Sequence, residues 1–303
     1  MYQMSGQALL LAAQAGWKEW KFYDPGFFLI AVPIVFLYGI CIGSFLTVVI
    51  IRLPRGESLV KRASHCMTCG AKIRIIDLIP VFSWLFLKGR CHSCGEKISA
   101  RYPIVESLNG LLYIANFFVF GFNLNMVLMC IFTSLLIVVA FMDWDTKEVD
   151  LRVLLLIALL AIPGHFVNDI TLTQRLIGMV CIALPFFLIG EVSRVIIRKK
   201  TGEDYRGIEL GDTYLMAAAG LYLGWKPMIL AFFVGIMTAV VGGLIQKKVS
   251  GDSQFAFCPY LCIGLLVGAM FGEELVTWWL GWLLSSMPSD PGPKSYFSAF
   301  FLR

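Results

Sequence analysis

The sequence predicts an all-α polytopic membrane protein with about eight transmembrane helices and one polar loop between the first two. Hydrophobic residues make up 58% and charged residues only 15% of the 303 residues, whereas a soluble globular domain carries about 25% charged residues. The mean hydropathy is +0.79. The apolar residues also gather into runs long enough to cross a hydrocarbon core of roughly 30 Å. Together these observations exclude an ordinary soluble domain.

Composition divides the chain into five segments. Residues 1–26 mix apolar, aromatic and basic positions, which favours an external interfacial helix, with a disordered tail as the alternative. Residues 27–51 form the first transmembrane span, and residues 52–102 form the polar loop. Residues 103–286 are predicted to form a membrane domain of seven further spans, and residues 287–303 a C-terminal tail.

Hydropathy places the eight spans at 27–51, 104–122, 124–142, 151–168, 173–193, 213–225, 227–246 and 260–284. The polar loop 52–102 carries ten Lys and Arg residues against three acidic ones. The positive-inside rule therefore places this loop in the cytoplasm and both termini outside. The loops at 194–212 and 247–259 contain further basic residues and fall on the same side. The span at 213–225 is short, so we expect it to begin within the preceding turn or to be partly re-entrant.

Four cysteines in the polar loop form two C-x2-C units. Cys66 and Cys69 make the first unit, Cys91 and Cys94 make the second, and 21 residues separate the two. Paired units at about this separation are typical of a tetrahedral structural zinc site. Two redox pairs or disulfides are the alternative, which a reducing cytoplasm disfavours. The remaining cysteines lie in or beside apolar runs, as small buried hydrophobic residues do: Cys41, Cys130, Cys181, Cys258 and Cys262.

Two acidic stretches interrupt membrane-length apolar runs. Asp143 follows the run 124–142, and Asp212 immediately precedes another apolar run. A carboxylate at the edge of a bilayer is costly, which makes it a functional-site hypothesis by default. In the eight-span arrangement both lie at the cytoplasmic edge, so Asp143 and Asp212 are predicted to form a catalytic dyad in which one carboxylate activates water and the other polarises a carbonyl. A helix cap or a solvated carboxylate is the alternative for either residue.

Three further residues are assigned supporting roles. Gly211 precedes Asp212 and lets the backbone turn and a substrate approach closely. Glu209 is expected to raise carboxyl pKa values in the same turn by like-charge repulsion. Glu106, at the start of the second span, is predicted either to contact a basic substrate residue or a loop arginine, or to pair locally.

The order of these motifs resembles that of the type IV prepilin peptidases, membrane-embedded aspartic proteases of the bacterial inner membrane. The resemblance runs from about residue 38 to 270 and rests on residues 43–54, 66–94, 101–106, 142–146, 211–212 and 259–261. The chain departs from the family pattern at several positions. Glu209 stands in place of the first Gly of a Gly-x-Gly-Asp motif, Tyr214 in place of a Lys, and Cys258 in place of a Gly.

The resemblance implies cleavage of the basic leader of prepilins or pseudopilins after a Gly at the cytoplasmic face. It also implies methylation of the new N-terminus by S-adenosylmethionine, although no Gly-rich cofactor motif is visible and no cofactor-binding residue is assigned. The expected partners are these substrates and the lipid bilayer, with no nucleic acid. A non-cleaving adaptor that binds prepilins or secretion components is the alternative, motivated by Glu209 and Tyr214. A transporter with midplane carboxylates is disfavoured, because both aspartates lie near the cytoplasmic edge.

Overall fold

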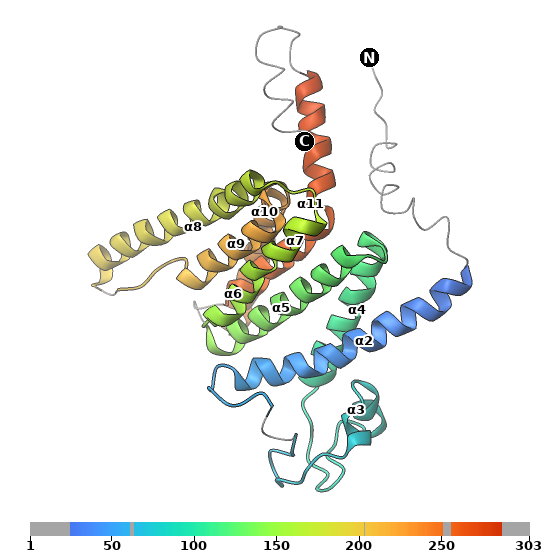
Figure 1. Ribbon diagram of the computed structural model, residues 1–303. Helices are drawn as coiled ribbons and strands as arrows, with labels where there is room; N and C mark the ends of the chain where they lie inside the picture. The colour runs from blue at the N-terminus through green and yellow to red at the C-terminus, as the bar shows by residue number, and fades with distance from the viewer. Residues whose placement is uncertain (1–24, 61–63, 203, 251–255, 287–303) are drawn as a thin grey trace. The chain divides into compact units, whose positions relative to one another are not determined.

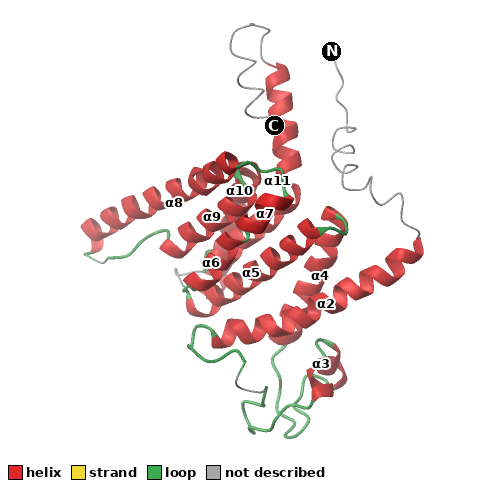
Figure 2. Cartoon of the chain, in the orientation of Figure 1, coloured by secondary structure: helices red, strands yellow, loops and turns green. Residues whose placement is uncertain are grey.

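The computed structural model describes residues 25–60, 64–202, 204–250 and 256–286 (Figure 1). The predicted terminal segments, up to residue 24 and from residue 287, lie outside these described residues. Within them the chain is helical with connecting loops (Figure 2), and β-structure is limited to two isolated bridges. The predicted all-α fold class is therefore confirmed.

The described helices belong to two compact units. The first unit holds the described residues up to Val153, the second begins at Leu154, and the boundary between them falls within the predicted membrane domain 103–286. The long helices of the first unit are α2 (Pro25–Arg52), α4 (Arg101–Phe120) and α5 (Leu124–Thr146). All three pack against one another. Gly43 allows α2 and α4 to approach closely, because a Cβ there would lie 2.8 Å from the Cα of Glu106.

A buried polar network joins the three helices of the first unit. The side-chain amide of Asn109 on α4 donates to the carbonyl oxygen of Gly39 on α2 (2.7 Å). Asn109 Oδ1 accepts from the hydroxyl of Ser134 on α5 (2.9 Å), and the Tyr113 hydroxyl lies 3.0 Å from the same Ser134 oxygen. Polar groups at membrane depth need partners within the protein. The network therefore fixes how the three helices align.

The polar loop between α2 and α4 contains only two short helices, η2 (Ile75–Leu78) and α3 (Phe82–Phe86). The Trp84 indole N–H donates to the carbonyl oxygen of Ile98 (3.1 Å), which ties α3 to the end of the loop. The backbone N–H of Val81 donates to Glu106 Oε2 of α4 (2.6 Å). This last bond anchors the middle of the loop to the second predicted span.

The second unit is built around α9. After α6 (Leu151–Leu159), which crosses the unit boundary, its helices are α7 (Ala161–Val167), α8 (Leu172–Thr201), α9 (Leu210–Leu223), α10 (Trp225–Ser250) and α11 (Cys258–Ser286). Helix α9 contacts α7, α8, α10 and α11. Gly178 and Gly220 let α8 and α9 touch backbone to backbone, because a Cβ on Gly220 would lie 2.1 Å from the Gly178 carbonyl oxygen.

Six of the described helices are long and apolar enough to cross a membrane: 26–52, 101–120, 124–146, 172–201, 225–246 and 258–283. Each corresponds to one of the predicted spans. The other two predicted spans, 151–168 and 213–225, correspond to shorter helices, α6 with α7 and α9. As expected, the second of these begins before residue 213, at Leu210. The total of eight spans stays a prediction.

Candidate functional site

The four loop cysteines come together in the first unit. The Sγ atoms of Cys66, Cys69, Cys91 and Cys94 all lie within 4.8 Å of one another, and those of Cys66 and Cys94 are 3.9 Å apart. None of the four forms a disulfide. A Zn–S distance of about 2.3 Å in a tetrahedron places sulfur atoms about 3.8 Å apart. The donor set and its spacing therefore fit a tetrahedral metal ion.

The two cysteine units adopt the same local geometry. In the first, the N–H of Gly70 donates to the Cys66 carbonyl oxygen (2.9 Å), and in the second the N–H of Gly95 donates to that of Cys91 (2.9 Å). Both glycines have a positive φ, +70° and +73°, which a residue without a Cβ adopts readily. Each turn places the two sulfur atoms of its unit on the same side of the backbone, so each C-x2-C unit supplies two of the four metal ligands.

The thiols differ in their ease of ionisation. Backbone N–H groups of Cys69 and Thr68 lower the pKa of the Cys66 thiol to about 6, which favours a thiolate at neutral pH. For Cys94, the N–H of Glu96 lowers the pKa, but desolvation and the three neighbouring thiols outweigh it and raise the pKa to about 12. A bound divalent cation offsets such repulsion and deprotonates its thiol ligands.

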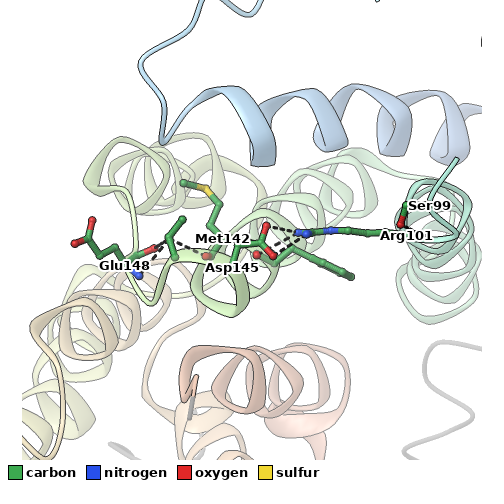
Figure 3. Close-up of polar contacts among 7 residues, drawn as sticks. Ser99, Arg101, Met142, Asp145 and Glu148 are labelled. Carbon is green, nitrogen blue, oxygen red and sulfur yellow. Dashed lines mark hydrogen bonds and ion pairs between the residues drawn. The ribbon is translucent and has the colours of Figure 1, made fainter. Parts of the chain in front are cut away.

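Asp143 is buried near the C-terminal end of α5, with 6% of its surface exposed. The helix ends at Lys147, whose backbone is left-handed and whose N–H donates to the Asp143 carbonyl oxygen (2.9 Å). The Thr146 hydroxyl donates to the Met142 carbonyl oxygen (2.9 Å) and accepts from the N–H of Glu148 (3.3 Å), as Figure 3 shows. These bonds hold the last turn that carries Asp143.

Asp145 lies in the same turn but has a different environment. Its carboxylate forms a bidentate ion pair with the guanidinium of Arg101 on α4, with both N–O distances 2.6 Å (Figure 3). The Arg101 guanidinium also lies 5.2 Å from the centre of the Phe141 ring. Two residues along a helix are about 200° apart around its axis, so Asp143 and Asp145 face different ways. Asp143 is therefore the buried carboxylate of this turn, whereas Asp145 holds α5 to α4 through its ion pair with Arg101.

Replacing Arg101 with Ala is expected to lower the free energy of unfolding by about 0.5–2 kcal/mol, because it removes a partly exposed ion pair and a cation–π contact. Thermal unfolding of the purified protein in detergent measures the loss. Arg74→Ala is the matched control, because Arg74 pairs with its near neighbour Asp77 and its side chain is 54% exposed. An Arg101→Ala protein no less stable than this control would contradict the assigned role.

Asp212 is buried in the first turn of α9, with 5% of its surface exposed. The positive end of the helix dipole favours a carboxylate there. The thiol of Cys258, the first residue of α11, donates to Asp212 Oδ1 (2.8 Å). Cys258 itself is only 1% exposed. Sequence reasoning placed Cys258 among the buried hydrophobic cysteines and missed this contact, although the departure from the family's Gly at this position marked it.

The supporting residues have distinct surroundings. Gly211 is half-buried in the first turn of α9, next to Asp212, and its predicted role in the approach of substrate stays a prediction. Glu209 is the exposed N-cap residue of α9, and its side chain makes no capping hydrogen bond. Glu106 is 7% exposed and accepts from the N–H of Val81, 25 residues earlier in the polar loop, which is neither of the contacts predicted for it; its predicted contact with a basic substrate residue stays a prediction. Asp143 belongs to the first unit and Asp212 to the second.

Two family models match the chain: "Bacterial Peptidase A24 N-terminal domain" over residues 37–120 and "Type IV leader peptidase family" over residues 130–244. A relative from Myxococcus xanthus (strain DK1622), named prepilin leader peptidase/N-methyltransferase, is 35% identical over 75% of this chain and 67% of its own length. Relatives of the same name from Aeromonas hydrophila and Bacillus subtilis (strain 168) are 31% and 26% identical, each over 82% of this chain, and over 93% and 98% of their own lengths. No solved structure matches the chain.

Proposed function

The chain belongs to the type IV leader peptidase family, and on this premise we propose that it is a membrane-embedded aspartic endopeptidase that removes the basic leader of type IV prepilins or pseudopilins. The observation that carries the proposal is the burial of two carboxylates at helix ends, Asp143 (6% exposed) and Asp212 (5% exposed). Aspartates are almost never fully buried unless they are paired or functional. The names of the relatives indicate the substrate class.

Asp143 and Asp212 are proposed to act as a dyad that shares one proton, because two nearby carboxylates in a low-dielectric site do not both ionise. The ionised carboxylate takes a proton from water as the water oxygen attacks the scissile carbonyl carbon. The protonated carboxyl group donates to the carbonyl oxygen and stabilises the developing negative charge. The carboxyl group that took the water proton then donates it to the leaving amine nitrogen as the carbon–nitrogen bond breaks, and the other carboxylate takes a hydroxyl proton back from the intermediate.

Cys258 is proposed to orient the Asp212 carboxylate through its thiol hydrogen bond. Replacing Cys258 with Ala is expected to lower kcat several-fold, since a hydrogen bond of this kind contributes about 1 kcal/mol. Cys258→Ser keeps a donor and should retain more activity. Cys262→Ala is the control, because Cys262 is also buried on α11. Kinetics on a prepilin substrate measure the effect, and an unchanged kcat in Cys258→Ala would refute the role.

The four-cysteine cluster is proposed to hold a structural zinc ion. All four ligands are protein thiols, and a structural zinc site is closed in this way, whereas a catalytic one keeps an open position. The ion would fix the shape of the polar loop rather than take part in peptide cleavage. Zinc accordingly has no step in the mechanism above.

Methylation of the new N-terminus by S-adenosylmethionine is proposed as the second activity, because the relatives carry N-methyltransferase in their names. The described residues contain no β-strand apart from two isolated bridges. They therefore do not fit the Gly-rich strand–turn–helix loop that holds many cofactors. No residue is assigned to the methyl donor.

The protein is proposed to lie in the bacterial inner membrane with its polar loop and both aspartates on the cytoplasmic side and its termini outside. The test is incubation of the purified protein with a prepilin in membranes and S-adenosylmethionine, followed by mass spectrometry of the pilin N-terminus. The expected product begins after the leader glycine and carries one added methyl group. Uncleaved prepilin that stays bound would instead favour the non-cleaving adaptor.

A further inference from the structure

Arg175 has the least exposed of the charged side chains that the structure describes, at 1%. It lies in the first turns of α8 and reaches the end of α9, where its Nη1 donates to the carbonyl oxygens of Tyr222 (2.7 Å) and Leu221 (3.3 Å). Its other two nitrogens, Nε and Nη2, are buried and have no hydrogen-bond partner among the described residues. Capping α9 therefore uses only one of the three nitrogens.

The charge of Arg175 also has no counter-ion among the described residues. No carboxylate of the described residues lies within ion-pair distance of its guanidinium, and an arginine does not lose its proton in proteins. A buried charge is costly unless it is paired and hydrogen-bonded. The two unpartnered donors therefore call for an anionic acceptor from outside the described chain.

A pocket of about 510 Å³ lies beside this guanidinium, and Arg175 forms part of its wall. Its other lining residues include His165 and the apolar Leu159, Ile162, Phe166 and Leu172. These four apolar side chains are 45–84% exposed. The pocket thus joins one cationic group to an apolar surface, which suits a ligand with an anionic head and a hydrocarbon chain.

The position of Arg175 along α8 indicates where that ligand comes from. Arg175 is the fourth residue of a helix long enough to cross a membrane, about 4.5 Å from the helix start at 1.5 Å per residue. Lipid headgroups lie at the level where a membrane-crossing helix ends. We propose that this pocket binds an anionic phospholipid, with its acyl chains along Ile162 and Phe166 and its phosphate bound by Arg175, whose Nε and Nη2 reach it once the side chain turns toward the pocket.

The bound lipid would hold together four helices, because the pocket is lined by residues of α6, α7, α8 and α9. Helix α9 carries Asp212 at its other end. The proposal does not depend on proteolysis, since lipid binding is measured without any substrate.

The test uses full-length protein stripped of lipid in detergent and titrated with phosphatidylglycerol, with a diacylglycerol of the same chains, or with inorganic phosphate. Native mass spectrometry counts the bound molecules. Phosphatidylglycerol should bind at one per chain, and at least about tenfold more tightly than either other probe, because only it combines the phosphate with the chains. Arg175→Gln should weaken this binding at least about tenfold.

Ile162→Trp is the second variant, because it fills the pocket without touching the charge, and it should also weaken binding. Arg198→Gln removes an exposed arginine from the other end of α8 and should leave the affinity unchanged. Thermal unfolding confirms that each variant is folded, and Ile162→Trp decides the matter if Arg175→Gln does not fold. Wild-type affinity in the pocket variants, or equal binding of diacylglycerol or of inorganic phosphate, would overturn the proposal.

Discussion

Asp143→Asn and Asp212→Asn are each expected to lower the rate of prepilin cleavage by at least roughly 10²–10⁴-fold, the usual contribution of a general acid or base. Asparagine has nearly the shape of aspartate but neither accepts nor releases a proton in the dyad. Both residues are buried, at 6% and 5% exposure, so the substitution removes the chemistry with little change in packing. The rate of leader release by purified protein in detergent or vesicles measures the effect.

Asp145→Asn is the matched control for Asp143→Asn. Asp145 lies two residues away on the same helix, but its carboxylate pairs with Arg101. Its replacement should lower the stability of the first unit and leave most of the cleavage rate. Cleavage that persists in a folded Asp143→Asn or Asp212→Asn protein would remove that residue from the dyad.

The apolar runs of the sequence locate the long helices well and their ends poorly. The sequence predicts a span at 124–142, whereas α5 continues through the polar turn to Thr146. It predicts a span at 173–193, whereas α8 continues to Thr201 through a basic last turn. Backbone hydrogen bonding does not stop where hydropathy falls, and cations favour a helix C-terminus. Hydropathy therefore marks the part of a helix within the bilayer and not the helix itself.

The span predicted at 151–168 shows a different limit. The structure divides it into α6 and α7, with the break at Leu160. Pro163 accounts for this break, because a proline clashes with the carbonyl group four residues before it, here that of Leu159. The apolar composition is continuous across the break, so hydropathy alone gives one segment.

At the candidate site, the sequence predicts the contacts that depend on local residue spacing and misses those that depend on packing between distant segments. Two C-x2-C units contain their own turn geometry, and the cluster of four sulfur atoms follows from that pattern. The contact between Cys258 and Asp212 joins residues 46 positions apart. It depends on how the start of α11 packs against α9, so residue spacing does not predict it, and only the departure from the family's Gly at this position marked Cys258. Glu106 likewise meets Val81 only because the polar loop folds back on α4.

If the four cysteines hold zinc as proposed, Cys66→Ser is expected to release it and to unfold much of the polar loop. Of residues 64–100, all of which the structure describes, only Gly89 is buried. Neither η2 nor α3 buries a residue. A segment without a hydrophobic core needs another source of folding free energy. Structural zinc supplies about 10–16 kcal/mol of apparent binding free energy in small domains, so losing one ligand should remove several kcal/mol.

Metal content per chain and limited proteolysis of the loop measure this effect, and a strong chelator should reproduce it in the wild-type protein. Cys181→Ser is the control, because Cys181 is a half-buried thiol on α8 outside the cluster. It should keep one zinc per chain and an intact loop. Because Val81 in the middle of the loop bonds to Glu106 on α4, metal loss should also loosen the start of α4, where Arg101 pairs with Asp145. A loop that stays resistant to protease after the metal has gone would mean that its hydrogen bonds alone hold it folded.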